Sequence, residues 1–169
     1  EILRCLVGSE MCIRDRPAYT TAIGTQSSAA TIPVTTQCTK NNGVSDGMAE
    51  FVCPLCATIH LSGSTITLTS CAMAVMVMTN QSIGFGKMFP FILMLGVTMV
   101  AAPGVPGGAV MAALGILQSM LGFDETMCGL MIALYIAQDS FGTACNVTGD
   151  GAIAVLMDAI TGKKKAAAK

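Results

Sequence analysis

Met88 to Phe123 reads MFPFILMLGVTMVAAPGVPGGAVMAALGILQSMLGF, and this run of 36 residues without Asp, Glu, Lys or Arg decides the fold. A straight helix of that length would measure about 54 Å, against about 30 Å for the hydrocarbon core of a bilayer, and two crossings would need about 40 residues plus a polar turn. The middle of the run, AAPGVPGG at 101–108, contains prolines and glycines that stop a helix. We therefore expect a re-entrant helical hairpin at 86–122, with arms of roughly 14 residues on one side of the membrane. Backbone at that depth is tolerated where it lines a site, so the tip is expected to contact a ligand.

The composition of the whole chain also indicates a membrane protein. Of its 169 residues 53% are hydrophobic and 11% are charged, whereas about 25% of the residues in a soluble domain are charged. A second uncharged run of 36 residues extends from Phe51 to Gly86. A buried soluble bundle is the weaker alternative, because its helices would need charged outer faces. Nucleic-acid binding has no support, since Trp is absent and no basic patch alternates with aromatic residues.

Three further elements follow from breaks and polar stretches. Residues 27–40 are expected to form the returning arm of another hairpin. A discontinuous helix at 45–79 is interrupted at 60–64, HLSGS, where freed carbonyls could hold a cation. The last helix, at 124–161, starts with an acidic residue that suits the helix dipole, and a basic tail follows at 163–169. Counting crossings places Lys40 and the tail on one side, which the positive-inside rule makes cytoplasmic.

The first sixteen residues, EILRCLVGSEMCIRDR, differ in texture from everything that follows. They contain three arginines and three acidic residues, lack the long apolar core of a signal peptide, and resemble a translated sequencing adapter. We expect 1–16 to be non-native sequence, so that the fold at 17–162 begins within an element near Pro17 and further helices precede it.

A polar stripe runs along the last helix. Tyr135, Asp139, Thr143, Asn146 and Asp150 are spaced by 4, 4, 3 and 4 residues, which places them within an arc of about 80°. A carboxylate near the membrane centre costs roughly 2.5–3.5 kcal/mol on insertion scales unless it meets a cation, a donor or water. The bland alternative is that the two aspartates are structural groups bonded to neighbouring helices or lie at the water interface. The functional interpretation is that Asp139 accepts from a substrate ammonium and Asp150 binds a cation.

The breaks elsewhere in the chain supply complementary groups. Hard cations such as Na⁺ prefer carboxylate and carbonyl oxygens, and broken helices free carbonyls. Helix N-termini at hairpin tips present N–H groups and a positive dipole, which suit a carboxylate. An amino acid would satisfy both poles. The one CxxC spacing, Cys53 and Cys56, lacks the strand-turn-helix context of a redox motif. We expect a transporter and not an enzyme.

Four motifs in order resemble the C-terminal half of the dicarboxylate/amino acid:cation symporters, the glutamate transporter homologues. They are TQSSAATIPVT at 25–35, CATIHLSGS at 56–64, GVPGG at 104–108 and DSFGTACNVTGD at 139–150. Together they cover nearly all of 17–161. The resemblance implies an all-α membrane protein of re-entrant hairpins and discontinuous helices, an elevator transport domain gated by the second hairpin. It also implies a multi-pass cell-membrane protein that forms a homotrimer through scaffold helices, so the chain alone is not expected to transport.

The resemblance also implies site residues. For the amino-acid substrate they are Ser27, Ser28, Val105, Asp139, Thr143 and Asn146. The first cation site maps to the carbonyls of Cys56, His60 and Asn146 with the carboxylate of Asp150, and the second to the carbonyls of Thr58, Met99, Val100 and Ala102. The expected coupling ion is Na⁺, with H⁺ as the alternative.

Departures from the family pattern bear on the substrate. Where members with acidic substrates carry an arginine that clamps the side-chain carboxylate, this chain has Gly142. The run from Gln138 to Ala144 is more similar to serine/threonine transporters, which favours a small neutral amino acid over an acidic amino acid or dicarboxylate. The broken helix has HLSGS where the family usually has Asn-Met-Asp-Gly-Thr, which puts a third cation site in doubt. His60, the one histidine, is more often a hydrogen-bonded structural group in such a break than a proton carrier. A channel or an inert membrane fragment is the alternative from another class.

Overall fold

The structure, a computed structural model, describes residues 9–167, and within them every regular element is an α-helix. This confirms the predicted all-α class. The elements are α2 Ser9–Arg14, α3 Arg16–Thr25, α4 Ser28–Asn41, α5 Asp46–Ile59, α6 Ser62–Met78, α7 Phe85–Val100, α8 Gly108–Leu121 and α9 Glu125–Ala167. Of the segment 1–16 that we expect to be non-native, residues 1–8 lie outside the described residues, as do 168 and 169 of the basic tail.

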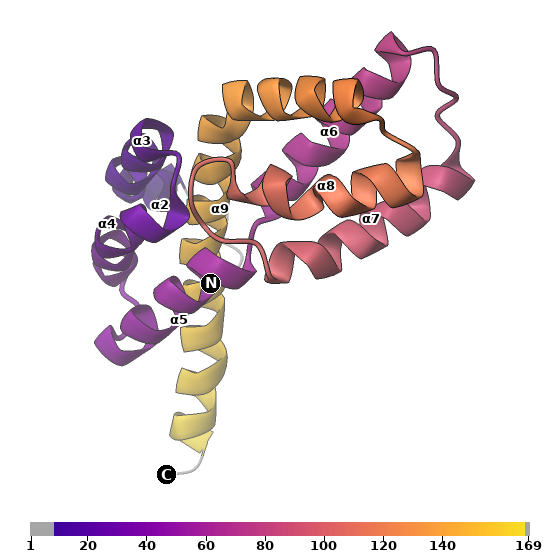
Figure 1. Ribbon diagram of the computed structural model, residues 1–169. Helices are drawn as coiled ribbons and strands as arrows, with labels where there is room; N and C mark the ends of the chain where they lie inside the picture. The colour runs from indigo at the N-terminus through magenta and orange to yellow at the C-terminus, as the bar shows by residue number, and fades with distance from the viewer. Residues whose placement is uncertain (1–8, 168–169) are drawn as a thin grey trace.

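Helix α9 is the central helix of the fold, and it is contacted by α3, α4, α5, α6 and α8. In Figure 1 its N-terminal part runs beside α6 and α8, and the helix then turns and passes α3, α4 and α5. The chain thus forms two groups of helices on one backbone element, with α2–α5 on one part of α9 and α6–α8 on the other.

Two helical hairpins and one broken helix surround α9. The first hairpin pairs α3 with α4 across a two-residue tip at Gln26 and Ser27. The second pairs α7 with α8, which lie side by side in Figure 1. Between the hairpins, α5 ends at Ile59 and α6 begins at Ser62. In the second hairpin, α7 has 16 residues and α8 has 14. At 1.5 Å per residue, neither helix would cross a hydrocarbon core of about 30 Å.

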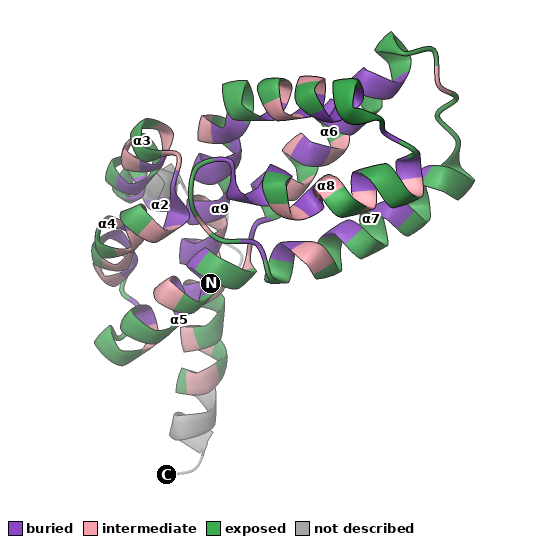
Figure 2. Ribbon diagram, viewed as in Figure 1, coloured by how far each residue is buried: buried purple, intermediate pink, exposed green. Residues whose placement is uncertain are grey.

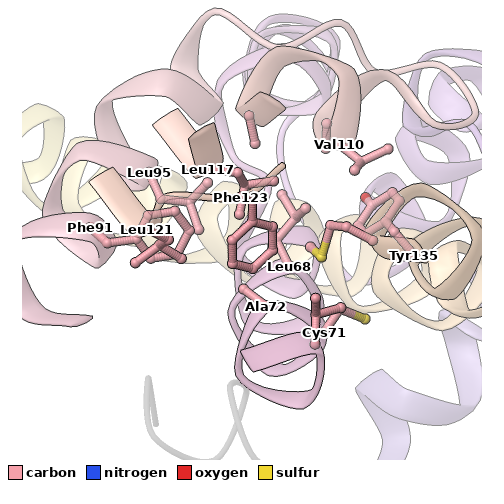
Figure 3. Packing of buried hydrophobic residues seen from close by; sticks show 14 of the residues in the cluster. Leu68, Cys71, Ala72, Phe91, Leu95, Val110, Leu117, Leu121, Phe123 and Tyr135 are labelled. Atoms are coloured by element: carbon pink, nitrogen blue, oxygen red, sulfur yellow. The ribbon is translucent and has the colours of Figure 1, made fainter. Parts of the chain in front are cut away.

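The largest apolar cluster joins α6, α7, α8 and the first turns of α9. Figure 3 shows Leu68, Phe91, Leu117, Leu121 and Tyr135 among its members, all at most 1% exposed. Burying side chains of this size contributes about 1.5–3 kcal/mol each in water, and in lipid the close packing itself holds the helices together. The second hairpin is therefore packed onto α6 and α9 along its length.

The outer faces of these helices carry large exposed apolar side chains. Figure 2 shows the exposed residues on the outer side of α7 and α8. On α7 they include Phe85, Phe89, Leu93 and Val97, each close to half exposed or more. One stretch, Asp46–Met78, is long and apolar enough by length and composition to cross a membrane when α5 and α6 are taken together, and α7 and α8 are shorter apolar helices. Exposed faces of this kind suit lipid.

Helix ends are capped by specific side chains and glycines. Asp124 Oδ1 accepts from the backbone N–H of Met127 at 2.8 Å, which caps the start of α9. Gly122, at φ +73°, ends α8 in the left-handed conformation, and Lys87 Nζ donates to the carbonyl of Leu121 at 2.9 Å. Lys87 thereby ties the start of α7 to the end of α8 at the base of the second hairpin.

Ser45 stands at the N-cap of α5 without a side-chain capping bond, and its hydroxyl donates to Asp158 Oδ1 at 2.5 Å. One helix end differs from the prediction. Helix α9 continues past the predicted end at Thr161 to Ala167. Lysine and alanine are good helix formers, so the basic tail extends the helix rather than ending it.

Candidate functional site

The polar stripe of α9 is buried inside the fold. Tyr135, Asp139, Thr143, Asn146 and Asp150 are each at most 3% exposed. The stripe therefore does not face solvent or lipid. Burying two carboxylates and an amide requires partners, and the partners come from the second hairpin tip and from the break between α5 and α6.

The two hairpin tips contact each other. Ser27 Oγ donates to the carbonyl of Gly104 at 2.8 Å, and the backbone N–H of Ala29 donates to the same carbonyl at 3.2 Å. Ser27 also caps α4, accepting from the N–H of Ala30 at 3.2 Å. A Cβ on Gly104 would lie 2.7 Å from the carbonyl oxygen of Ala57, so only glycine lets the second tip come this close to α5.

Asp139 binds the second hairpin tip directly. Its Oδ2 accepts from the backbone N–H of Gly107 at 2.8 Å, and its Oδ1 lies 3.5 Å from the hydroxyl of Thr143. Gly107 is the N-cap of α8 and has φ +71°, a conformation that favours glycine. The carboxylate thus holds the positive end of a helix dipole, which stabilises both the buried charge and the closed position of the tip.

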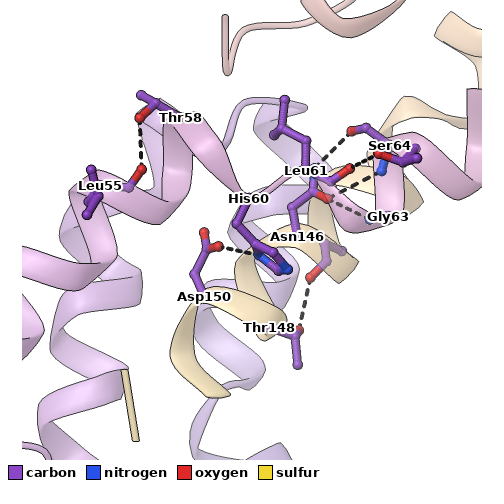
Figure 4. A network of polar contacts seen from close by, with 11 residues as sticks. Leu55, Thr58, His60, Leu61, Gly63, Ser64, Asn146, Thr148 and Asp150 are labelled. Carbon is purple, nitrogen blue, oxygen red and sulfur yellow. Dashed lines mark hydrogen bonds and ion pairs between the residues drawn. The ribbon is translucent and has the colours of Figure 1, made fainter. Parts of the chain in front are cut away.

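Asn146 caps the second half of the broken helix. Its Oδ1 accepts from the N–H groups of Gly63 and Ser64 at 2.8 and 3.3 Å, and its Nδ2 donates to Ser64 Oγ at 2.9 Å. These bonds replace the intrahelical partners that the first amides of α6 lack. Figure 4 shows this network on the α9 side of the break. Sequence analysis expected Asn146 to contact the substrate and did not anticipate this capping role.

His60 and Asp150 form the other half of the network. His60 Nδ1 lies 2.8 Å from Asp150 Oδ1, and the two side chains point toward each other in Figure 4. The backbone N–H of His60 donates to the carbonyl of Cys56 at 2.8 Å and ends α5. Sequence analysis placed the His60 carbonyl, rather than its ring, beside Asp150.

A small cavity of about 10 Å³ lies between these groups, room for about one water molecule. Its wall includes five of the predicted substrate residues: Ser28, Val105, Asp139, Thr143 and Asn146. Ser27 is not part of the wall, because its hydroxyl is bound to Gly104. The residues that sequence analysis did not assign to the substrate are Gln26, Leu61, Ser64, Pro103, Gly104, Ala109 and Tyr135. All of these except Ala109 lie in the stripe or in the stretches already singled out, 25–35, 60–64 and 101–108, which predict a tip or a break without assigning a role to each side chain.

The second predicted cation set lies around the end of α7. Met99 and Ala102 are buried, and the carbonyl of Met99 accepts from the N–H of Ala102 at 3.3 Å. Val100 and Thr58 have exposed side chains, and the hydroxyl of Thr58 donates to the carbonyl of Leu55 at 2.8 Å. The last carbonyls of a helix lack intrahelical partners, so this region offers the oxygen donors that Na⁺ prefers.

The profile of the sodium:dicarboxylate symporter family matches residues 9–160. The chain belongs to this family. The match starts inside the segment 1–16, and the expectation that this segment is non-native stays a prediction. Membership implies a membrane protein, and the family and the relatives it includes are transporters, not enzymes.

Several curated members of the family are similar to the chain at about 30% identity. Human neutral amino acid transporter B(0) is 30% identical over 131 residues, which are 77% of this chain and 24% of that protein. Human excitatory amino acid transporter 1 is 31% identical over 134 residues, 79% of this chain and 24% of that protein. Mouse excitatory amino acid transporter 5 is 31% identical over 137 residues, which are 80% of this chain and 24% of that protein. The chain spans about a quarter of the length of these relatives.

The family name implies a sodium ion, and the two predicted cation sets differ in how well they fit one. The second set, at Thr58, Met99, Val100 and Ala102, consists of carbonyl oxygens, which Na⁺ prefers, and in it the Met99 carbonyl also accepts from the N–H of Ala102. The set around Asp150 does not fit as it stands, because the ring of His60 lies at hydrogen-bond distance from Asp150 Oδ1, where an ion would approach. Asp150 Oδ1 thus already has a partner within the protein.

Proposed function

We propose that this chain forms the substrate-binding part of a secondary active transporter that carries a small neutral amino acid together with a cation. One observation carries the proposal: Asp139, 3% exposed, is the one charged residue in the wall of the cavity between the two hairpin tips. A buried carboxylate beside helix N-termini suits a ligand that carries one ammonium and one carboxylate.

Each pole of an amino acid has a partner in this arrangement. Asp139 would accept hydrogen bonds from the ammonium, with Thr143 one turn further along α9. The carboxylate would lie against the N-terminus of α4 at Ser28, where the first N–H groups of the helix and its dipole favour an anion. A charge-assisted hydrogen bond to Asp139 is worth about 1.5–3 kcal/mol.

The selectivity for a neutral side chain follows from what the wall contains. No lysine or arginine is among the residues that line the cavity, so a second carboxylate on the substrate would have no cationic partner and would face Asp139. A larger residue in place of Gly142 would be tight toward α6, since a Cβ there would lie 3.2 Å from Thr67 Oγ1 and Thr67 would have to shift. The name of the B(0) relative, a neutral amino acid transporter, agrees with this proposal.

Substrate entry requires the second hairpin to move. A cavity of about 10 Å³ is too small for an amino acid, and two contacts close it: Gly107 with Asp139, and Ser27 with Gly104. We propose that the α7–α8 hairpin is the gate, that both hairpins are re-entrant, and that the whole group of helices moves as an elevator domain. The lysines near the C-terminal end of α9 would then lie in the cytoplasm, and the complete transporter would be a homotrimer with Na⁺ held at the end of α7.

Binding of amino acids to the purified protein in lipid nanodiscs tests the proposal. Serine should bind more tightly than aspartate when Na⁺ is present, and Asp139→Asn should weaken serine binding roughly 10- to 100-fold, the equivalent of about 1.5–3 kcal/mol. The matched control is Gln138→Asn, which changes the exposed residue directly before Asp139 on the same helix. It should leave the affinity for serine unchanged. Tighter binding of aspartate than of serine would refute the neutral substrate.

A further inference from the structure

The ring of His60 occupies the space beside the buried carboxylate of Asp150. His60 Nδ1 is 2.8 Å from Asp150 Oδ1, the side chain of Asp150 is 1% exposed, and that of His60 is 26% exposed. The two residues are 90 positions apart in the sequence and come from the α5–α6 break and from α9. The contact therefore joins two elements of the fold.

The backbone of α9 is shaped to receive the ring. A Cβ on Gly149 would lie 2.4 Å from His60 Cε1 and 3.3 and 3.4 Å from the two ring nitrogens. The imidazole thus fills the place that any side chain at 149 would take. The backbone of His60 is itself held at the end of α5, where its N–H donates to the carbonyl of Cys56. The ring is packed against a backbone surface and is not a loose surface side chain.

This position coincides with the first predicted cation set. That set needs the carboxylate of Asp150 and the carbonyls of Cys56, His60 and Asn146 around one ion. A ring nitrogen at hydrogen-bond distance stands where an ion would have to approach the carboxylate oxygen. The contact also gives the buried Asp150 Oδ1 a hydrogen-bond partner within the protein, in the place where a metal ion would supply one.

We propose that the imidazole of His60 takes the place of the sodium ion at the first predicted cation set. This transporter then binds one sodium ion, at the second set, and not two. The remaining sodium lies at the end of α7, with the carbonyls of Thr58, Met99, Val100 and Ala102. The inference rests on the proposed function, because it concerns the coupling ions of that transporter.

The number of sodium ions bound per chain tests whether the His60 ring replaces an ion. Binding of ²²Na⁺ to the purified protein in nanodiscs is measured for the wild type and for His60→Asn, which removes the ring and keeps the backbone carbonyl. The variant should bind one more Na⁺ per chain than the wild type. The double variant His60→Asn/Asp150→Asn should lose the added ion, because its carboxylate is gone. Gln138→Asn serves as the matched control, and circular dichroism checks that each variant is folded.

A spectroscopic measurement on the wild type keeps the test independent of the variants. Because His60 is the one histidine in the sequence, labelling with ¹⁵N-histidine gives ring signals from this residue alone. These signals should not move as Na⁺ replaces N-methylglucamine at constant ionic strength. A saturable shift with Na⁺, or no added ion in a folded His60→Asn variant, would overturn the inference. Serine binding on the same samples reports on the proposed function separately.

Discussion

Replacing Asn146 by alanine should destabilise the junction between α9 and α6. The amide of Asn146, in a residue 1% exposed, accepts from the N–H groups of Gly63 and Ser64 and donates to the hydroxyl of Ser64. Alanine removes all three bonds and leaves the first donors of α6 without their partner. Water is scarce at this depth, so the exposed amides would have no ready replacement.

The expected cost can be worked from these contacts. Loss of a helix N-cap costs about 0.5–2 kcal/mol, and a buried donor left unsatisfied costs about 1–3 kcal/mol. Since the bonds belong to one network, their contributions do not simply add. We expect Asn146→Ala to lower the free energy of unfolding by about 2–4 kcal/mol, which reduces the ratio of folded to unfolded protein roughly 30- to 1,000-fold.

Two measurements check this value. Reversible unfolding in mixed micelles, followed by circular dichroism, gives the free energy difference, and hydrogen exchange at Gly63 and Ser64 reports on the cap itself. Gln138→Ala, on an exposed position of the same helix, is the control and should change the free energy by less than about 0.5 kcal/mol. If Asn146→Ala behaves like this control and the two amides stay protected, the capping role assigned to Asn146 is incorrect.

Three other substitutions or titrations have defined outcomes. Ser27→Ala removes the bond to Gly104 and the cap of α4, and should increase the rate of proteolysis in the 101–108 tip while costing about 1–2 kcal/mol of stability. Gly63→Ala should destabilise the chain by at least about 1–3 kcal/mol in thermal unfolding, because the new Cβ would lie 2.3 Å from a backbone carbonyl oxygen of α9. The pKa of Lys40 is raised above its ordinary value of 10.5, first by its hydrogen bond to Glu50 at 2.6 Å. Protonated Lys40 therefore stabilises the fold below about pH 10.5, and this stabilisation is lost as the pH rises through the higher pKa of the folded state. Glu50→Gln should lower that pKa in an NMR titration, and an unchanged value would exclude the pair as its cause.

The helical class and the places where helices break could be predicted from local sequence alone. The uncharged run at 88–123 is too long for one crossing and too short for two, and its prolines and glycines lie in the middle, so its length and its breaks point to the same hairpin. The stripe on α9 could be found because its five residues recur at helical spacing, and the structure buries all of them. Both inferences need only the geometry of a single helix.

Contacts between distant elements could not be predicted in the same way. Ser27 and Gly104 are 77 residues apart, and Asn146 and Gly63 are 83 apart, so nothing in either local pattern indicates the partner. The direction of the His60 ring could not be predicted either, because a break in a helix does not fix where the side chain of a residue in the break points. Gly149 was the available signal, since a glycine next to a buried aspartate indicates that something approaches the helix backbone closely.

The closed site explains why the breaks and the stripe occur together. Breaks in helices expose backbone groups that lipid cannot satisfy, and α9 supplies partners for two of them: Asp139 accepts from the N–H of Gly107 at the second tip, and Asn146 accepts from the first N–H groups of α6. Under the proposed function, a substrate ammonium would compete with the N–H of Gly107 for the carboxylate of Asp139. Substrate binding and opening of the second hairpin would then be linked, because the group proposed to recognise the substrate is also the group that bonds the tip. It follows that a change at Asp139 should alter both the affinity for serine and the mobility of the 101–108 tip.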